Sequence, residues 1–386
     1  MLHSILQGGP YVQRFPFCPN KFCDLHEKAP KEAWYSRLGD YETKAFGTVV
    51  RFVCSHCKRS FSSQTFSTHY YAKKVVDLKE VLSRQAESQS NRAIGRALGL
   101  SPDSVQNRLD RLSRQAMAAH AAMRTHANPH ESVCIDGFVS FDQSQYFPNE
   151  ITISITSSSQ YILELSHATR RRSGTMTKDQ AAKAHSLYAL AQLEQGGIQR
   201  SFRDQLDFLA TLRPPSFHAP LILVTDEKPE YRQLLYQHPL FLTQDESHRV
   251  AHIRVWSKLP RTYMNPLFAS NYLDKEIRKD QANHHRETAC FTRNVSHGLA
   301  RLACYVGHHN YFKKFRIKAP VWDTRTHADV AGIDPAIQKR SLKSLFTKRA
   351  FLSKTDLTAP MERVWRKLAG TPLKQKGDYL PQYALG

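Results

Sequence analysis

The chain has 386 residues, of which 41% are hydrophobic and 10% aromatic, so it is long enough and apolar enough for roughly two or three folded domains. Lysine and arginine number 55 against 34 aspartates and glutamates, which gives a formal charge of +21. This imbalance indicates a polyanionic partner, of which nucleic acid is the commonest.

The composition also argues against membrane and secreted proteins. No run of about eighteen apolar residues, the length of a membrane span, is present, and residues 1–8 lack a basic stretch ahead of a long apolar one. The seven cysteines are odd in number and unevenly placed, which favours a metal site in a reducing cytoplasm over a disulfide framework. We therefore expect a cytoplasmic protein without membrane contact.

Four cysteines form two short-spaced pairs, Cys18 with Cys23 and Cys54 with Cys57. Two such pairs about thirty residues apart can place four thiolates around one tetrahedral Zn²⁺. The spacing predicts a zinc ribbon over residues 1–72, with free structural thiols as the alternative. Since four protein ligands leave no open position, this zinc is expected to be structural.

The residues around the cysteine pairs extend this prediction. His26 and His56 could each replace a ligand, but they are expected to be bystanders. The second pair is followed by a basic and aromatic tail, in which Arg59 is expected to contact a phosphate backbone.

A helical period of apolar residues begins near Val75 and continues to Met123. A glycine turn at Gly99 precedes Ser101, which can cap a helix, and Pro102, which can start it. Helix, glycine turn and capped helix predict a helix-turn-helix DNA-binding domain over residues 73–127. Four polar residues of its last helix are expected to face a major groove: Gln106, Asn107, Arg108 and Arg111. The alternative is a helical hairpin that only packs.

Two apolar stretches each end in a carboxylate. Residues 132–135 lead to Asp136, which is followed by a glycine, and residues 221–225 lead to Asp226. Such stretches read as buried strands. Paired carboxylates repel one another unless a cation lies between them, and hard oxygen ligands select Mg²⁺ or Mn²⁺. Taken singly, each aspartate could merely open a turn or cap a helix.

The order of the remaining elements predicts the fold of residues 128–320. Three antiparallel strands are followed by alternating helices and strands and then by helices, which is the order of an α/β ribonuclease-H-like core, a mixed sheet with flanking helices. Three arginines after the third strand form a basic loop that is expected to hold DNA: Arg170, Arg171 and Arg172. Residues 321–386 read as a basic helical extension.

Zinc ribbon, helix-turn-helix and ribonuclease-H-like core, in this order, resemble the bacterial insertion-sequence transposases of the DDE superfamily. The resemblance covers about residues 15–320 and is carried by the ribbon around Cys54, the strands ending at Asp136 and Asp226, and the segment from Asn265 to Asn294. It implies cut-and-paste or copy-type DNA transposition by a nucleoid-associated bacterial protein, in which metal-activated water cuts one strand and the freed 3′-hydroxyl attacks target DNA.

The family usually places a third acid, a glutamate, on a helix after the second aspartate, and here the sequence departs from that pattern. At 100° per residue Asp274 shares a polar face with Asn271 and Arg278, whereas Glu276 points nearly the opposite way. Asp274 is therefore the expected third ligand, with Asn271 beside it and Arg278 on the DNA. Glu276 is the alternative, and both acids could also be ordinary surface charges.

The sequence thus predicts a metal-dependent transposase that binds the ends of its own element and a target as double-stranded DNA. It is expected to act as a homodimer or higher oligomer with Zn²⁺ and with Mg²⁺ or Mn²⁺. The alternative is a DNA-binding regulator derived from a transposase and lacking catalysis. The two strand-end acids favour the enzyme.

Overall fold

The computed structural model describes residues 14–28, 30, 32–212, 220–242, 250–285 and 290–386. Residues 1–8, where no secretion signal is expected, lie outside these ranges. The chain divides into two compact units. The first contains Met1–Val75, Thr347–Ser353 and Gln382–Gly386, and the second contains Val76–Phe346 and Lys354–Pro381.

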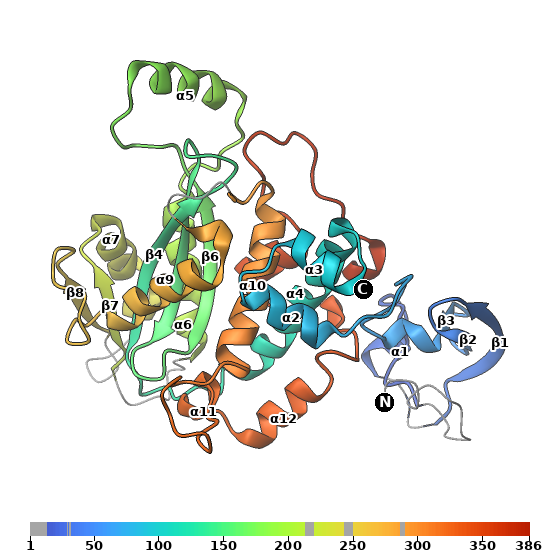
Figure 1. The fold of residues 1–386 in the computed structure, drawn as a ribbon. Helices are drawn as coiled ribbons and strands as arrows, with labels where there is room; N and C mark the ends of the chain where they lie inside the picture. The colour runs from blue at the N-terminus through green and yellow to red at the C-terminus, as the bar shows by residue number, and fades with distance from the viewer. Residues whose placement is uncertain (1–13, 29, 31, 213–219, 243–249, 286–289) are drawn as a thin grey trace. The chain divides into compact units, whose positions relative to one another are not determined.

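The first unit is built on a small antiparallel sheet in the order β1-β2-β3 (Figure 1). Its strands are β1 (Tyr35–Thr43), β2 (Gly47–Cys54) and β3 (Ser60–Ser62), and the short helix α1 (Asp24–Glu27) precedes them. Gly47 adopts a φ of 63°, which allows the tight turn between β1 and β2. Aromatic rings fill the space beside the cysteines, with Phe15 packed edge-on against Phe61 and Phe52.

Two segments near the C-terminus complete this unit. The backbone N–H of Arg349 donates to the carbonyl of Phe66, and that of Thr68 donates to the carbonyl of Thr347. Lys21 donates to the carbonyl of Leu385. The basic extension expected at residues 321–386 therefore contributes residues to both compact units.

The second unit contains a mixed five-stranded sheet in the order β6-β5-β4-β7-β8. Its strands are β4 (Val133–Phe141), β5 (Pro148–Thr156), β6 (Ile162–Thr169), β7 (Ile222–Asp226) and β8 (Ala251–Val255). The first three are antiparallel neighbours, whereas β7 runs parallel to both β4 and β8. A mixed sheet with flanking helices is confirmed as the architecture of this region.

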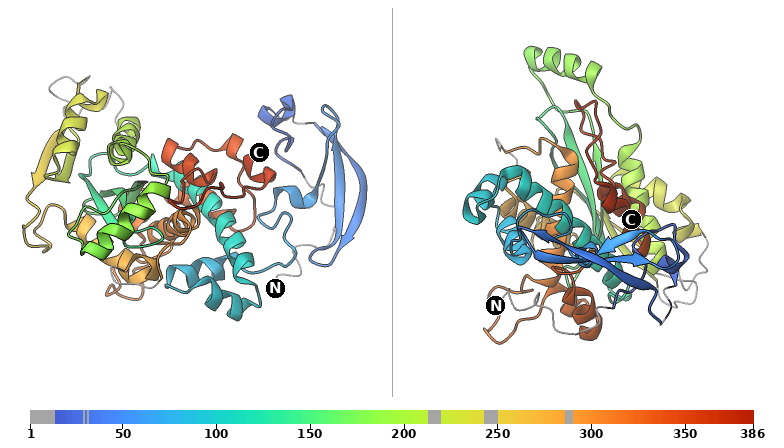
Figure 2. Two further views of the ribbon diagram at one scale, coloured as in Figure 1. Left: turned by 90° about the horizontal axis from the view of Figure 1, so that it is seen from above. Right: turned by 90° about the vertical axis from the view of Figure 1, so that its right-hand side faces the viewer.

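Helices cover both faces of the sheet, as Figures 1 and 2 show. The helices α9 (Phe268–Asp280) and α10 (Val295–Tyr311) pack on the face that carries Cys134 and Phe138. The opposite face, which carries Ile135, packs against α6 (Gly197–Leu212) and α7 (Pro229–Gln237). Because alternate residues of a strand point to opposite faces, the sequence of β4 determines which side chains meet which helices.

The predicted helix-turn-helix region forms three helices, α2 (Leu78–Ala86), α3 (Asn91–Leu98) and α4 (Pro102–Arg124). Gly99 ends α3 in a left-handed conformation, and the hydroxyl of Ser101 accepts from the backbone of Ser104 to cap α4, so the predicted turn and cap are present. These helices share one compact unit with the sheet, and Met123 of α4 packs in the same apolar core as Ile135.

Five further α-helices lie in the described part of the second unit. They are α5 (Lys178–Leu190), α8 (Pro239–Leu242), α11 (His327–Val330), α12 (Pro335–Lys343) and α13 (Ala359–Trp365). Within the described ranges, none of the helices has the length and apolar character needed to cross a lipid bilayer.

Candidate functional site

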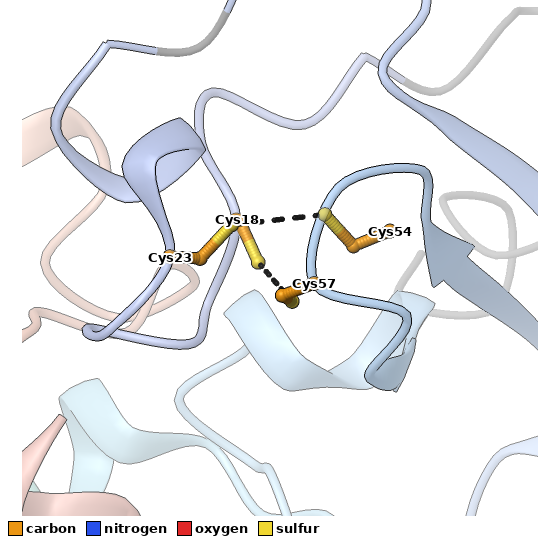
Figure 3. A group of neighbouring side chains, drawn as sticks. All are labelled: Cys18, Cys23, Cys54 and Cys57. Carbon is orange, nitrogen blue, oxygen red and sulfur yellow. Dashed lines mark hydrogen bonds between the residues drawn. The ribbon is translucent and has the colours of Figure 1, made fainter.

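The four predicted cysteines lie together in the first unit (Figure 3). The sulfur atoms of Cys18 and Cys57 are 3.7 Å apart, those of Cys23 and Cys54 are 3.9 Å apart, and all four lie within 4.8 Å of one another. Thiolates placed about 2.3 Å from a zinc ion in a tetrahedron are about 3.8 Å from one another. The cluster is therefore consistent with a structural zinc site.

Two tight loops bring the sulfur atoms together. The backbone N–H of Lys58 donates to the carbonyl of Cys54, and Lys58 itself takes a left-handed φ of 57° to close this turn.

Burial raises the pKa of Cys18. Burial also acts to raise the pKa of Cys57, but hydrogen bonds from the backbone of Arg59 and from Asn20 outweigh it and lower this pKa to about 7.

Neither nearby histidine belongs to the sulfur cluster. His26 is buried and is held by the carbonyl of Cys18 at 2.6 Å and the hydroxyl of Ser353 at 2.7 Å. The Nδ1 atom of His56 lies 3.6 Å from the sulfur of Cys23, while its Nε2 atom lies 3.3 Å from Asp24. Both rings support the loops that carry the cysteines.

The two predicted strand-end acids lie side by side in the second unit. Ile135 of β4 is the register partner of Thr225 of β7, and Asp136 and Asp226 are the next residues of these parallel strands. Cys134 and Val224, two residues earlier, both pack on the α9 face. Since side chains alternate along a strand, Asp136 and Asp226 point toward that same face.

The environment of this pair opposes a second negative charge. Burial raises the pKa of Asp136, and the charge of Asp226 raises it further. Lys228 acts in the opposite direction, as does the backbone N–H of Gly137, which donates to Asp136 at 2.7 Å. Two carboxylates held this way provide oxygen ligands of the kind that Mg²⁺ or Mn²⁺ prefers.

Three further residues border the acids, and sequence reasoning missed all of them. The ammonium of Lys228 lies 2.9 Å from Glu150, 3.1 Å from the hydroxyl of Tyr231 and 3.9 Å from Asp226. The Tyr231 hydroxyl donates to the same oxygen of Glu150 at 3.0 Å. Glu150 is buried next to the strand-end acids, and Lys228 and Tyr231 are its partners there.

The glycine after Asp136 makes room for this network. A Cβ atom at Gly137 would lie 2.6 Å from a carboxylate oxygen of Glu150, which is closer than atoms tolerate. The signals for Glu150 and Lys228 in the sequence were therefore weak: a glycine after one acid and a lysine two residues after the other.

Helix α9, which carries the predicted third ligand, runs along β4. The Cys134 thiol donates to the carbonyl of Pro266 at 3.3 Å near its start, and Arg278 lies 3.5 Å from the carbonyl of Val139 near its end. The twelve steps along the chain from Pro266 to Arg278, most of them within α9, rise about 18 Å at the helical spacing, and the five steps from Cys134 to Val139 rise about 17 Å as strand. The turn that begins at Asn271 is thus level with Asp136.

The two alternative acids of α9 have different surroundings. Glu276 is buried, forms an ion pair with Lys313 and lies 3.1 Å from Lys279. Burial raises the pKa of Glu276, but these two cations outweigh it and the pKa is lowered. Asp274 lies 3.7 Å from Arg278. Glu276 therefore already has a structural role, which leaves Asp274 as the better candidate ligand.

The remaining predicted residues of α9 are held within the protein. The Asn271 amide donates to the carbonyl of Leu267 at 3.1 Å, and the Arg278 guanidinium lies 4.6 Å from the ring centre of Phe138. Within the described residues, the four cysteines are the one group of three or more potential ligands close enough together to hold a metal ion. The three aspartates are not drawn together to that extent.

The residues predicted to face a major groove are not free on the surface. Gln106, Arg108 and Arg111 are buried, and Asn107 is half-buried. Gln106 accepts from Asn91 at 3.0 Å and donates to Asp110 at 2.8 Å. The expected exposure of these side chains is wrong, because a helical period cannot reveal which other elements pack against a polar face.

The other predicted DNA contacts are more accessible. Arg59 is exposed and lies 3.4 Å from the amide oxygen of Asn20. Of the basic loop, Arg171 is exposed with its guanidinium 5.3 Å from the Tyr188 ring, whereas Arg170 and Arg172 are half-buried. Contact of these residues with DNA stays a prediction.

Comparison of the sequence with models of known protein families finds no match. Comparison with curated proteins finds no similar sequence either.

Proposed function

We propose that this chain is a DNA transposase of the DDE type, which binds the ends of its own mobile element and cuts and joins DNA strands. One observation carries the proposal: Asp136 and Asp226 occupy adjacent positions on the central parallel strands and point to the same face. The strand order of the mixed sheet supports a ribonuclease-H-like core. The formal charge of +21 supports a nucleic-acid partner.

In this proposal the residues of the chain position the reacting groups. Asp136, Asp226 and Asp274, with Asn271, would hold Mg²⁺ or Mn²⁺, which when bound supplies an activated attacking oxygen and stabilises the leaving one. The ion pair between Lys228 and Glu150 holds the backbone next to the two strand-end acids in place. The four cysteines of the first unit would hold a structural zinc.

The test is cleavage of the ends of the element that encodes the protein, in the presence of Mn²⁺. Asp136→Asn and Asp226→Asn are each expected to reduce strand cleavage at least about 10³-fold, the size of effect expected when a metal ligand or comparable charge is lost. Binding to the element ends should persist in both variants. Asp356→Asn, which changes an exposed acid, is the matched control.

The outcomes separate the two functions that the sequence suggests. Full cleavage by Asp136→Asn with unchanged metal dependence contradicts the proposed active site. End-specific binding by the wild-type protein without cleavage under any metal condition supports a DNA-binding regulator instead.

A further inference from the structure

The segment that joins β8 to α9 presents apolar and basic side chains to solvent. We name residues 254–264, which include the last two residues of β8, the aromatic-basic loop. Trp256 is 56% exposed, Tyr263 79% and Met264 74%. Large exposed apolar side chains gathered in one segment indicate a binding surface rather than ordinary surface composition.

The charge of this segment has one sign. From Val250 to Leu273 the chain has no aspartate or glutamate, while the aromatic-basic loop contains Arg254, Lys258 and Arg261. Lys258 and Arg261 are exposed. Neither of them forms an ion pair within the part of the chain that the structure describes. Exposed rings beside unpaired cations suit a polyanion with flat, stackable groups, which is a nucleic acid.

The loop has a defined shape. The backbone N–H of Leu259 donates to the carbonyl of Trp256 at 2.9 Å, and the buried side chain of Asn265 donates to the carbonyl of Pro260 at 3.0 Å. The Asn265 side chain also accepts from the backbone of Leu267. The exposed rings are therefore presented by an ordered turn anchored at both ends.

The loop joins β8, the strand paired with the one that carries Asp226, to the helix that carries Asp274. Val255, the residue before Trp256, is the register partner of Asp226. The other end of the loop leads into α9, which carries Asp274. A nucleotide bound on this loop would be adjacent to the site at which the strand is cut.

From these observations we propose that the aromatic-basic loop binds unpaired nucleotides next to the cleaved phosphate. Trp256 and Tyr263 stack on exposed bases, and Lys258 and Arg261 neutralise the neighbouring phosphates. Bases within a duplex already stack on each other, so exposed rings select unpaired strands. The placement of this surface at the cut rests on the proposed function, whereas its affinity for unpaired strands can be measured independently.

The experiment measures binding by the full chain in EDTA, so that no cleavage occurs. The probes are a fluorescent oligothymidylate of about 20 nucleotides, longer than a typical single-strand footprint, and a duplex of the same length. Trp256→Ala and Tyr263→Ala are each expected to weaken single-strand binding about 5- to 100-fold, as loss of one stacked base does. Duplex binding should change less than about twofold.

Two matched variants accompany these substitutions. Trp322 is 81% exposed and also follows a basic segment, so Trp322→Ala tests whether any exposed tryptophan gives the effect. It should bind as the wild-type protein does. Trp256→Phe keeps a flat ring and should retain most of the affinity.

Intrinsic fluorescence provides a second readout. Of the four tryptophans, Trp34 and Trp365 are buried, so Trp322→Phe leaves Trp256 as the exposed emitter. Addition of oligothymidylate should quench this emission in Trp322→Phe but not in Trp256→Phe, because stacked bases quench the indole they contact.

Several results would overturn the inference. They are the absence of single-strand binding in the wild-type protein, unchanged affinity in both alanine variants, or an equal loss in Trp322→Ala. A lower oligomeric state in Trp256→Ala with unchanged DNA affinity would assign the loop to contacts between copies of the chain. If Asp136→Asn loses cleavage but Trp256→Ala binds single strands normally, only this inference is rejected. If single-strand binding depends on Trp256 but the wild-type protein does not cleave DNA, only the proposed function is rejected.

Discussion

Among single residues, Asp136 combines a folding cost with a proposed catalytic role. Its pKa is raised by burial and by Asp226. A carboxyl whose pKa is higher in the folded state stabilises the fold below its ordinary value of 3.8, and that stabilisation is lost as the pH rises through the folded pKa. At neutral pH the ionised Asp136 therefore destabilises the metal-free protein.

We accordingly expect Asp136→Asn to raise the melting temperature in EDTA at neutral pH, by about 1 to 3 °C. The same variant should be stabilised less by added Mg²⁺ than the wild-type protein. Thermal unfolding with and without Mg²⁺ measures both effects, with Asp356→Asn as a control on an exposed acid. A melting temperature several degrees lower in Asp136→Asn contradicts the proposed repulsion.

Lys228 and Glu150 form the second testable feature at this scale. The Glu150 side chain is 3% exposed, so removal of its cation leaves a buried charge without its main partner. Lys228→Met should reduce the free energy of unfolding by about 2 to 4 kcal/mol, and Lys228→Met with Glu150→Gln should recover much of this loss. Urea denaturation of the two single variants and the double variant measures the coupling. If the losses of the two single variants simply add in the double variant, Lys228 and Glu150 do not stabilise one another.

These residues also mark what the sequence could not reveal. Asp136 and Asp226 were predictable because an acid at the end of an apolar strand has no packing reason to be there. Glu150 lies within an alternating strand, where its burial depends on Tyr231 from a distant helix. A single sequence contains no sign of that contact.

Among the elements, α9 distinguishes two acids that are two residues apart. Asp274→Ala should lower cleavage about 10³-fold, as the strand-end variants do, with a small effect on stability. Glu276→Ala should leave the chemistry unaffected but lower the free energy of unfolding by about 1 to 3 kcal/mol, because it removes one of the two carboxylate partners of the largely buried Lys313 and leaves only Asp280.

Cleavage assays and urea denaturation of the two variants test this assignment together. Loss of cleavage in Glu276→Ala but not in Asp274→Ala, in proteins that remain folded, would place the third ligand on the other face of α9.

The cysteine loops provide a prediction of metal content. The full chain should contain one zinc, and Cys54→Ser should lose it because three thiolates no longer complete the tetrahedron. Cys290→Ser is the matched control, since Cys290 is an exposed cysteine outside the cluster. Elemental analysis of the purified proteins decides the matter. Well under one zinc in the wild-type chain, or full occupancy in Cys54→Ser, contradicts the prediction.

The elements themselves were largely predictable. The apolar stretch that leads to Asp226 forms β7 (Ile222–Asp226), and the helical period that begins near Val75 and continues to Met123 is that of α2, α3 and α4. Local patterns of this kind are strong because one face of each element is buried. The burial around α4 was not predictable, because contacts with the sheet depend on tertiary packing and not on the helix's own period.

Across the whole molecule, α4 connects distant parts of the second unit through a buried histidine. The His120 ring contacts the hydroxyl of Tyr311 on α10 at 2.7 Å and the carbonyl of Leu163 on β6 at 3.0 Å. The sequence predicted helices 73–127 and sheet 128–320 as separate domains, yet this contact and the shared apolar core join them within one compact unit. Contacts between residues so far apart in the chain leave no mark on local periodicity.

Buried neutral histidines give the second unit a dependence on pH. Burial lowers the pKa of His120 to about 3, that of His284 to about 4 and that of His327 to about 4. In the unfolded chain the same rings titrate near the ordinary value of 6.5. As the pH falls below 6.5, the unfolded state binds protons that the folded state does not, so stability is lost.

Each such histidine should contribute a slope of about 1.4 kcal/mol per pH unit once its unfolded form is protonated. The free energy of unfolding should therefore fall steadily from pH 6.5 toward pH 5, a range in which exposed carboxylates remain ionised. His120→Gln keeps a donor for the carbonyl of Leu163 but cannot titrate. Urea denaturation at several pH values should give His120→Gln a lower stability at neutral pH and a slope shallower by about one proton. His130→Gln, which changes an exposed histidine, is the matched control and should leave the slope unchanged. An equal slope in His120→Gln and the wild-type protein would show that His120 is not held neutral by the fold.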